Sequence, residues 1–372
     1  MKKADYKLRK VILKGFKSIA FDQPLEMEFG NVTVLLGANG AGKSNIVSFF
    51  KMLSFMMTRK LQAFIAQSGT SQRFLHYGIK KTPTLSAEIR FENEKGNYDT
   101  YRFSLAHAVP DRFIVNFEEI EYCNKEQNVS IHKAVLTSTF NETALNSESN
   151  KNDIKFLWHL VSGCKVYQFS DSSISSPMRQ AATVESAHYL QAEANNLSSF
   201  LYYLKNNYKE SYNRIVDYTK SVIPQFQDFY LEPEGNYITL KWIDNSANDY
   251  VFSADQLSDG SIRFIALATL LLQPQETIPN VILIDEPELG LHPYAIEQLV
   301  EMIKDASMRA QVVVASQSPA LLDGFDLDEI IIIEHNGDSS VARKVDSSEY
   351  EEWLKQYLPS ELWNKNVLGG RP

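Results

Sequence analysis

The segment NVTVLLGANGAGKSNIVSFF, from Asn31 to Phe50, sets the framework for the rest of the chain. It opens with the apolar run Val32–Leu36, which is typical of a buried strand. A glycine-rich loop follows, and after Lys43 the apolar residues recur at helical spacing. A strand, a GxxxxGKS loop and a helix in this order predict a phosphate-binding loop.

The residue types in this loop suit the binding of a polyphosphate. Backbone N–H groups must approach the phosphates in conformations that glycine adopts most easily, as at Gly37, Gly40 and Gly42. Lys43 is expected to reach the β- and γ-phosphates, and the Ser44 hydroxyl is expected to bind Mg²⁺. The predicted nucleotide-binding residues are Gly37, Ala38, Asn39, Gly40, Ala41, Gly42, Lys43, Ser44 and Asn45. The alternative is a glycine-rich turn without a ligand, and the strand before the loop and the helix after it favour the phosphate-binding interpretation.

The composition is that of a folded protein with free thiols. The chain has 372 residues, of which 44% are hydrophobic, so it can bury a sizeable core in one large or two ordinary domains. A net charge of −9 argues against a protein that is basic overall, although a local basic face is compatible with it. Cys123 and Cys164 lie outside any metal-binding pattern. The charged N-terminus and the shortness of the apolar run Ile262–Leu272 predict a cytoplasmic protein without a membrane segment.

Alternating apolar and polar residues predict two groups of strands in the first third of the chain. Tyr6–Lys17 and Leu25–Phe29 are expected to flank the phosphate-loop strand. Thr84–Phe91, Tyr98–Ala106 and Phe113–Tyr122 are expected to form an antiparallel meander attached to the nucleotide-binding core.

The middle of the chain has the composition of an insertion, rich in Ser, Asn, Thr and Lys from Asn124 to about Thr183. Helical spacing within Ala187–Val222 then predicts two helices, which either form a lid or arm over a ligand or only cover a sheet edge. The predicted division is a nucleotide-binding head in two parts, residues 1–123 and 224–372, with an inserted, partly helical lid or arm at residues 124–223.

A second motif, VILIDE at residues 281–286, supplies acidic groups. Val281–Ile284 has the character of a parallel strand buried on both faces. Ligands of open α/β sheets bind at the carboxyl ends of such strands, where Asp285 and Glu286 lie. Asp285 is expected to hold Mg²⁺ together with Ser44, and Glu286 to orient or polarise the water that attacks the γ-phosphate. A complete phosphate loop in the same chain favours this interpretation over a surface pair of acids.

A third motif, QLSDGS at residues 256–261, precedes an apolar helix. Ser258 or Asp259 can simply cap that helix. Alternatively, Ser258, Asp259 and Gly260 present the helix N-terminus to a phosphate. The position of the motif just before the acidic strand favours the second interpretation, so these three residues join the nucleotide-binding candidates.

GANGAGKS, LSDGS and VILIDEPELGLHP, in this order, resemble the motifs of the ATP-binding-cassette (ABC) class of ATPases, with LSDGS in place of an LSGGQ-type signature. The opening KVILKGFKSI resembles the RecF, SMC and OLD branch, whose members act around DNA. DEPELGLHP and the ending WNKNVLGGRP resemble stand-alone ATPases of the AAA_21 type in bacterial anti-phage defence operons, beside a separate effector that is often a nuclease. The resemblance covers about residues 6–53 and 256–334. It implies an α/β ABC-type head: a mixed sheet core with a phosphate-loop helix and an antiparallel β meander.

The resemblance also implies that ATP and Mg²⁺ join copies of the chain head to tail, in a dimer or a higher homo-oligomer. Ser258 and Gly260 of one copy would contact the γ-phosphate bound by the other, and Glu288–Leu291 would lie across the interface. His292 is either a base or a structural residue at the start of the next helix, and we favour the structural role.

One position departs from the class. Where a switch histidine is usual, this chain has Gln317, which hydrogen bonds but takes no positive charge. A weakened transition-state hydrogen bond can lower a rate about a hundredfold. We therefore predict an ATPase with slow turnover, whose catalytic residues are Lys43, Glu286 and Gln317.

Three functions remain open. The leading hypothesis is a cytoplasmic ATPase that controls a separate effector, such as a nuclease, in phage defence. The second is a RecF-like DNA-repair ATPase that binds DNA directly, and the third is a nucleotide-gated scaffold that hardly hydrolyses ATP. A membrane transporter is the least supported option. Asp326 and Asp328 could belong to a nuclease site, but we expect them to be loop acids.

Overall fold

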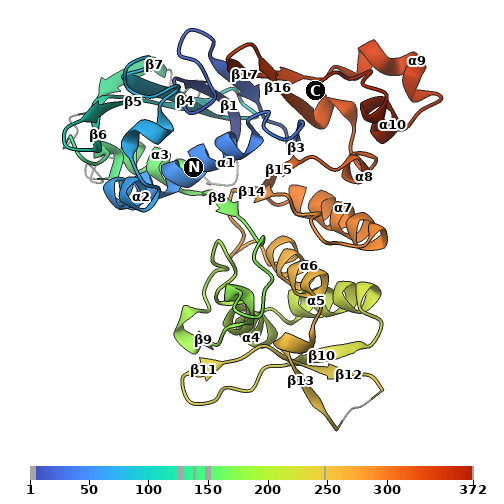
Figure 1. The fold of residues 1–372 in the computed structure, drawn as a ribbon. Helices are drawn as coiled ribbons and strands as arrows, with labels where there is room; N and C mark the ends of the chain where they lie inside the picture. Colours follow the sequence, from blue (N-terminus) through green and yellow to red (C-terminus); the bar gives the residue numbers. More distant parts are fainter. Residues whose placement is uncertain (1–5, 125–128, 137–139, 147–151, 247–248, 371–372) are drawn as a thin grey trace. The chain divides into compact units, whose positions relative to one another are not determined.

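The computed structural model describes residues 6–124, 129–136, 140–146, 152–246 and 249–370, and it contains strands and helices in comparable amounts (Figure 1). Contacts between residues divide the chain into two compact units. Unit 1 comprises the described parts of residues 1–165, 327–357 and 361–372, and unit 2 those of residues 166–326 and 358–360. The predicted insertion includes residues 125–128, 137–139 and 147–151, which lie outside the described residues.

Unit 1 contains an antiparallel sheet in the order β2-β1-β4-β5-β6-β7. Its strands are β1 (Tyr6–Lys14), β2 (Leu25–Glu28), β4 (Thr84–Asn93), β5 (Tyr98–Ala108), β6 (Arg112–Asn124) and β7 (Val129–Val135). Buried and partly exposed residues alternate along β1 and β4, because one face of the sheet packs into the core and the other faces outward. The predicted antiparallel meander is confirmed by the pairing of β4 with β5 and of β5 with β6.

The buried face of this sheet belongs to a core that also includes the helices of unit 1: α1 (Lys43–Met57), α2 (Leu61–Gln67) and α3 (Asn152–Ser162). Phe49 of α1 lies at the centre of an aromatic cluster. Its ring centroid lies 5.9 Å from Phe16, 5.5 Å from Phe50 and 6.4 Å from Phe103. The apolar face predicted for the helix after the phosphate loop therefore packs against the sheet, and this packing fixes where α1 begins.

The expectation that the first two strands flank the phosphate-loop strand is wrong. β1 pairs with β2 and β4, whereas β3 (Val32–Leu36) pairs in parallel with β16 (Ile330–Asn336). β16 in turn pairs with β17 (Ser339–Lys344) in an antiparallel hairpin. Every residue of β3 is buried, as in a strand covered on both faces, while β1 has the alternation of a strand covered on one.

Unit 2 places the acidic strand beside a parallel neighbour. β14 (Val281–Asp285) and β15 (Gln311–Ser316) pair in parallel and are connected by α7 (Pro293–Ser307). Beside α7 lies α6 (Asp259–Leu271), the apolar helix that follows the third motif. The two helices predicted within Ala187–Val222 are confirmed as α4 (Leu197–Asn207) and α5 (Lys209–Val222), and α5 packs on α6 and α7.

The remaining elements are short. In unit 2, β10, β12 and β13 form a three-stranded sheet, and β9 pairs with β11. The bounds of the short strands and helices are β8 (Cys164–Tyr167), β9 (Ala182–Thr183), β10 (Phe226–Tyr230), β11 (Tyr237–Ile238), β12 (Lys241–Asp244), β13 (Val251–Ser253), α8 (Pro319–Leu322), α9 (Glu351–Leu354) and α10 (Pro359–Asn364). Within the described residues, every helix is too short or too polar to span a bilayer.

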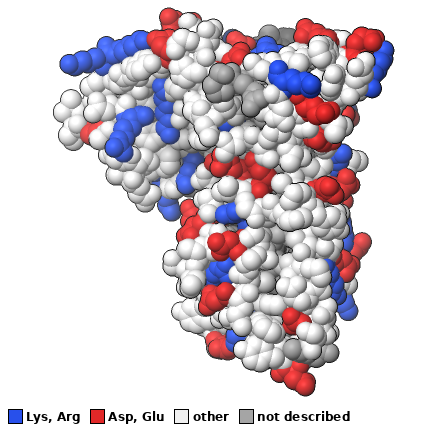
Figure 2. Space-filling model, turned by 45° about the vertical axis from the view of Figure 1, so that its right-hand side comes forward, with Lys and Arg blue, Asp and Glu red and all other residues white. Residues whose placement is uncertain are grey.

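Charged side chains of both signs occur on the face shown in Figure 2, with uncharged surface between them. Both cysteines are buried, and their thiols are free. Burial raises the pKa of the Cys164 thiol to about 12, so this thiol is uncharged at neutral pH.

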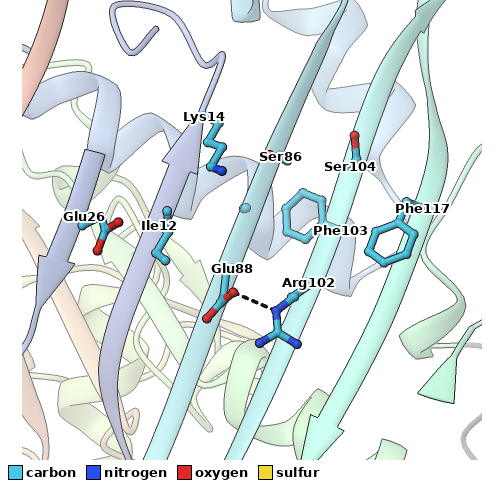
Figure 3. A pocket seen from close by; sticks show the side chains of 10 residues that line it. Ile12, Lys14, Glu26, Ser86, Glu88, Arg102, Phe103, Ser104 and Phe117 are labelled. Carbon is cyan, nitrogen blue, oxygen red and sulfur yellow. Dashed lines mark hydrogen bonds and ion pairs between the residues drawn. The ribbon is translucent and has the colours of Figure 1, made fainter. Parts of the chain in front are cut away.

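The outward face of the antiparallel sheet is hollowed by a cavity of about 270 Å³ (Figure 3). It is lined by Ile12, Lys14, Glu26, Ser86, Ala87, Glu88, Arg102, Phe103, Ser104 and Phe117. Arg102 donates to Glu88 at 2.7 Å, to Glu119 at 2.9 Å and to Glu121 at 2.7 Å. The hollow contains no residue of the phosphate loop, and the guanidinium at its rim is already bound by carboxylates.

The Arg102 network predicts a pH dependence of stability. Burial alone would raise the pKa of Glu121, but hydrogen bonds from Arg102, Lys133 and Tyr98 lower it from 4.5 to about 2. A carboxyl with a lowered folded-state pKa stabilises the fold fully above its unfolded value, and this contribution is lost as the pH falls toward 2. Urea unfolding between about pH 5 and pH 2 should show a shallower loss of the free energy of unfolding for Glu121→Gln than for wild type.

The matched control is Glu94→Gln, which changes an exposed carboxylate in the β4–β5 turn. It should keep the wild-type slope. An identical slope for Glu121→Gln and wild type would contradict the prediction.

Candidate functional site

The phosphate loop connects β3 to α1 in unit 1, and two of its glycines lie where side chains do not fit. A Cβ at Gly37 would overlap the carbonyl oxygen of Ile333 on β16. Gly42 has φ +117°, and a Cβ there would overlap the hydroxyl of Ser340 on β17. Gly40, at φ +81°, has open space beside it. The loop is therefore shaped by the β16–β17 hairpin on one side and is open at Gly40.

The N-terminus of α1 is suited to an anion. Its N-cap residue, Gly42, provides no side-chain cap, and the first helical turn contains no acidic residue. The first N–H groups of a helix have no acceptor within the helix, and they carry a partial positive charge. Lys43 is buried and donates to the carbonyl oxygens of Gly37 at 2.5 Å and Ala38 at 3.0 Å, while Ser44 is exposed. These groups fit a polyphosphate with a divalent cation at the Ser44 hydroxyl.

Two serines that no sequence motif marks, Ser18 and Ser340, support the loop through hydrogen bonds. Ser340 Oγ lies 2.7 Å from the Ala41 carbonyl oxygen and 2.7 Å from Ser18 Oγ. Asn45, predicted to bind nucleotide, donates from its side chain to Ser18 Oγ at 2.6 Å. The side chain of Asn45 thus belongs to the support of the loop. Ser18 and Ser340 are separated by most of the chain, so no local pattern could reveal their contact.

In unit 2 the acidic residues lie at the carboxyl end of β14, each beside a side-chain amide. Gln168 donates to Asp285 Oδ2 at 2.8 Å, and Gln317 donates to Glu286 Oε1 at 3.1 Å. Glu286 has φ +46°, an uncommon conformation for a residue with a side chain, and its N–H donates to the Ala315 carbonyl at 2.8 Å. The structure thus brings together the side chains of Glu286 and Gln317, two of the predicted catalytic residues.

Gln168 was missed because it follows β8 in the segment interpreted as an insertion, where no motif marks it. Its side chain reaches Asp285 although more than a hundred residues separate them in sequence. Only the strand pairing of the folded chain indicates this contact.

The third motif forms a capped helix start. Ser258 is the N-cap of α6 and accepts from the Ser261 N–H at 3.1 Å, so the capping role is confirmed. A Cβ at Gly260 would lie 2.5 Å from the carbonyl oxygen of Gly290, within the loop that follows the acidic strand. The third motif therefore touches the loop that follows the second motif within one unit, and the close approach leaves no room for a side chain at Gly260.

Two buried arginines connect the segment after Gln168 to these motifs. Arg263 of α6 donates to the carbonyl oxygens of Phe169 at 2.7 Å and Ser170 at 2.9 Å, and also to that of Leu289. Arg179 donates to Asp259 Oδ1 and to the Leu257 carbonyl oxygen, each at 3.2 Å. Moving the segment that contains Phe169 and Ser170, or the loop that contains Leu289, must therefore break hydrogen bonds of the buried Arg263. This shared partner couples the positions of the two segments.

Two other candidates have structural partners. His292 is the N-cap of α7 and accepts from the Tyr294 N–H at 3.4 Å, in agreement with the structural role. Asp328 accepts from the Ser347 N–H at 2.9 Å and from its hydroxyl at 2.6 Å, as a loop acid does.

Comparison with known proteins gives both a family and a fold. The AAA_21 family profile, described as an AAA domain, putative AbiEii toxin, type IV toxin–antitoxin system, matches residues 32–128 and 171–323. The chain is 32% identical over 100 residues to urease accessory protein 2 of Cryptococcus neoformans var. grubii, a match that covers 26% of this chain and 8% of that protein. The chain therefore spans only a small part of this curated relative.

Two solved structures share the fold. The crystal structure of an Smc head bound to the C-winged helix domain of ScpA superposes with a TM-score of 0.63 at 17% identity, covering 92% of this chain and 99% of that one. The Smc head with an extended coiled coil, bound to the C-terminal domain of ScpA from Pyrococcus furiosus, gives 0.61 at 15% identity, covering 94% and 99%. The mixed α/β head expected from the motifs is thus confirmed as an SMC-type fold. The chain belongs to the AAA_21 family, and its fold is that of the SMC heads.

Proposed function

We propose that this ATPase binds and slowly hydrolyses ATP with Mg²⁺, assembles with itself in the ATP-bound state, and thereby controls a separate effector in anti-phage defence. The observation on which the proposal rests is the uncapped N-terminus of α1 with Lys43 beside it. That arrangement places the positive end of a helix and a lysine side chain together, and both favour the phosphates of a nucleotide.

The loop residues 37–45 are assigned to the phosphates, with Lys43 on the β- and γ-phosphates. Ser44 and Asp285 are assigned to Mg²⁺, which neutralises phosphate charge when bound. The assignment to Ser44 is supported by its exposure, and that to Asp285 by its place at the end of a parallel strand.

Glu286 is assigned to the attacking water, whose proton a carboxylate can accept. The amide of Gln317, 3.1 Å away, can hold this carboxylate in place but cannot supply a positive charge. We therefore expect turnover to be slower than with a histidine at this position.

Self-assembly is supported by what the signature region exposes. Ser258 and Asp259 are exposed, and Leu289 and Tyr294 have exposed fractions of 45% and 46%. Large apolar side chains beside a helix N-terminus suit an interface that closes over a nucleotide bound by another copy. The proposed assembly is head to tail, with Ser258 and Gly260 of one copy at the γ-phosphate held by the other.

The effector is proposed from the family. Its description names a putative toxin of a toxin–antitoxin system, and the two similar Smc heads were solved with a bound domain of another protein. A head that regulates a partner such as a nuclease, in the cytoplasm, agrees with both. Direct DNA binding is the second candidate, but the mixed charges on the face in Figure 2 do not form one continuous basic surface there.

The first prediction concerns assembly. ATP with Mg²⁺ should increase the mass of the wild-type protein in solution, and Glu286→Gln should remain assembled because it binds ATP without hydrolysing it. Lys43→Ala should neither assemble nor release phosphate. Light scattering after size exclusion and a phosphate-release assay measure the two quantities. A mass that never responds to ATP, with normal ATP binding, would contradict nucleotide-driven assembly.

The second prediction concerns the switch position. Gln317→His should raise turnover, by up to about a hundredfold, because a protonatable imidazole adds charge stabilisation in the transition state. Gln317→Leu, which has similar volume and no hydrogen bond, should lower turnover below wild type. Single-turnover phosphate release distinguishes these outcomes. If all three proteins hydrolyse ATP equally slowly, Gln317 takes no part and the scaffold hypothesis gains support.

A further inference from the structure

Glu288 is a buried acid that the proposed mechanism does not use. It lies in the loop after β14, two residues beyond Glu286, and is 8% exposed. Ser316 Oγ lies 2.5 Å from Glu288 Oε1, while Oε2 is buried without a hydrogen-bond partner in the described part of the chain. A buried carboxyl group in this situation is costly to keep, so its position requires an explanation.

Its partner, Ser316, is the fully buried last residue of β15, directly before Gln317. The Ser316 hydroxyl also accepts from the Ser318 N–H at 3.0 Å. The Ser316 hydroxyl thus connects the Glu288 carboxyl group to the backbone N–H of Ser318, the residue after Gln317. The two residues that flank Gln317 are both fixed by this contact, which leaves Gln317 few alternative directions.

Gln317 reaches Glu286 from this fixed turn, with its amide nitrogen 3.1 Å from Glu286 Oε1. Glu286 and Glu288 are joined through the same loop, and the Leu289 N–H donates to the Glu286 carbonyl at 3.2 Å. The contacts form a closed path from Glu286 through Gln317 and Ser316 to Glu288 and back along the chain. Removing the Glu288 carboxyl group would remove the hydrogen bond between Glu288 and Ser316 and so break this path.

Burial raises the pKa of Glu288, and the charge of nearby Glu286 acts in the same direction. Hydrogen bonds from the Ser316 hydroxyl and from the backbone N–H groups of Glu288 and Gln317 act against this shift. An amide of the same shape at position 288 keeps an oxygen that accepts from Ser316, whereas the carboxylate proposed as the base at Glu286 cannot be replaced by an amide.

We propose that Glu288 is a positioning residue that acts through Ser316 to hold Gln317 beside Glu286. The inference rests on the proposed ATPase function, and it names the group that sets the geometry of the switch position. Glu288 touches neither the nucleotide nor the water in this proposal. Its effect is on kcat, through the placement of the amide of Gln317.

The test compares two glutamates that lie two residues apart. Glu288→Gln should keep kcat within about threefold of wild type, because the amide oxygen still accepts from Ser316, whereas Glu286→Gln should abolish turnover, because the proposed base is lost. Glu288→Leu should lower kcat about tenfold or more while KM and ATP affinity stay unchanged, because one hydrogen bond of the path is lost. Ser316→Ala should act alike, and combining it with Glu288→Leu should add little. Glu297→Gln, an exposed change on α7, is the control for a surface glutamate.

Three results would overturn the proposal: normal kcat in a folded Glu288→Leu protein, loss of activity in Glu288→Gln equal to that in Glu286→Gln, or fully additive effects of the Ser316 and Glu288 changes. Circular dichroism and thermal unfolding show which variants fold. A crystal structure of Glu288→Leu gives a readout that needs no turnover, since Gln317 should leave Glu286. If wild type shows no hydrolysis, the ATPase proposal fails, and this structure still tests the positioning role.

Discussion

The phosphate loop depends on a helix end that lacks a cap of its own. Most helices begin with a residue whose side chain accepts from the first N–H groups, and α1 begins with Gly42, which has none. The backbone at Gly42 is left-handed, and the space that a side chain would need is taken by Ser340. The partial positive charge of the helix N-terminus favours an anion there. The helix therefore forgoes the stabilisation of a side-chain cap at the end where the proposed nucleotide would bind.

This helix end is held in place by a part of the chain far away in sequence. β16 pairs with β3, and its backbone lies close to Gly37. The hydroxyl of Ser340 on β17 donates to the Ala41 carbonyl oxygen. The β16–β17 hairpin therefore shapes a loop that the chain forms near its beginning. Because both glycines are contacted by the hairpin, an added methyl group at either would push β3 and the hairpin apart.

The sequence predicts local features well and long-range contacts poorly. Periodicity was sufficient for α1, for the meander and for α4 and α5, because each pattern reports how one segment meets the core. The same alternation in β1 could not say which strand lies next to it, so its predicted place beside β3 was wrong. No local sequence pattern marks Gln168, Ser340 or the Glu288–Ser316 contact. The role of each polar residue depends on a partner that is distant in sequence and comes close only in the folded chain. The capping role of Ser258, in contrast, is indicated by the short segment Ser258–Ser261 alone, because the cap and its N–H donor lie within it.

The acidic residues at the end of β14 differ from the phosphate loop in the charge that their proposed roles need. Asp285 and Glu286 must be negatively charged to bind Mg²⁺ and to accept a proton. Amides from Gln168 and Gln317 donate to Asp285 and Glu286, so each acid is oriented by a neutral group. A neutral donor adds no positive charge to a transition state that gains negative charge. In the proposed mechanism, slow hydrolysis lengthens the time for which two copies remain joined. A regulator needs that duration, because its effector must stay controlled for as long as ATP is bound, whereas a motor would need rapid release. A glutamine at the expected switch position would therefore agree with the proposed control of a partner.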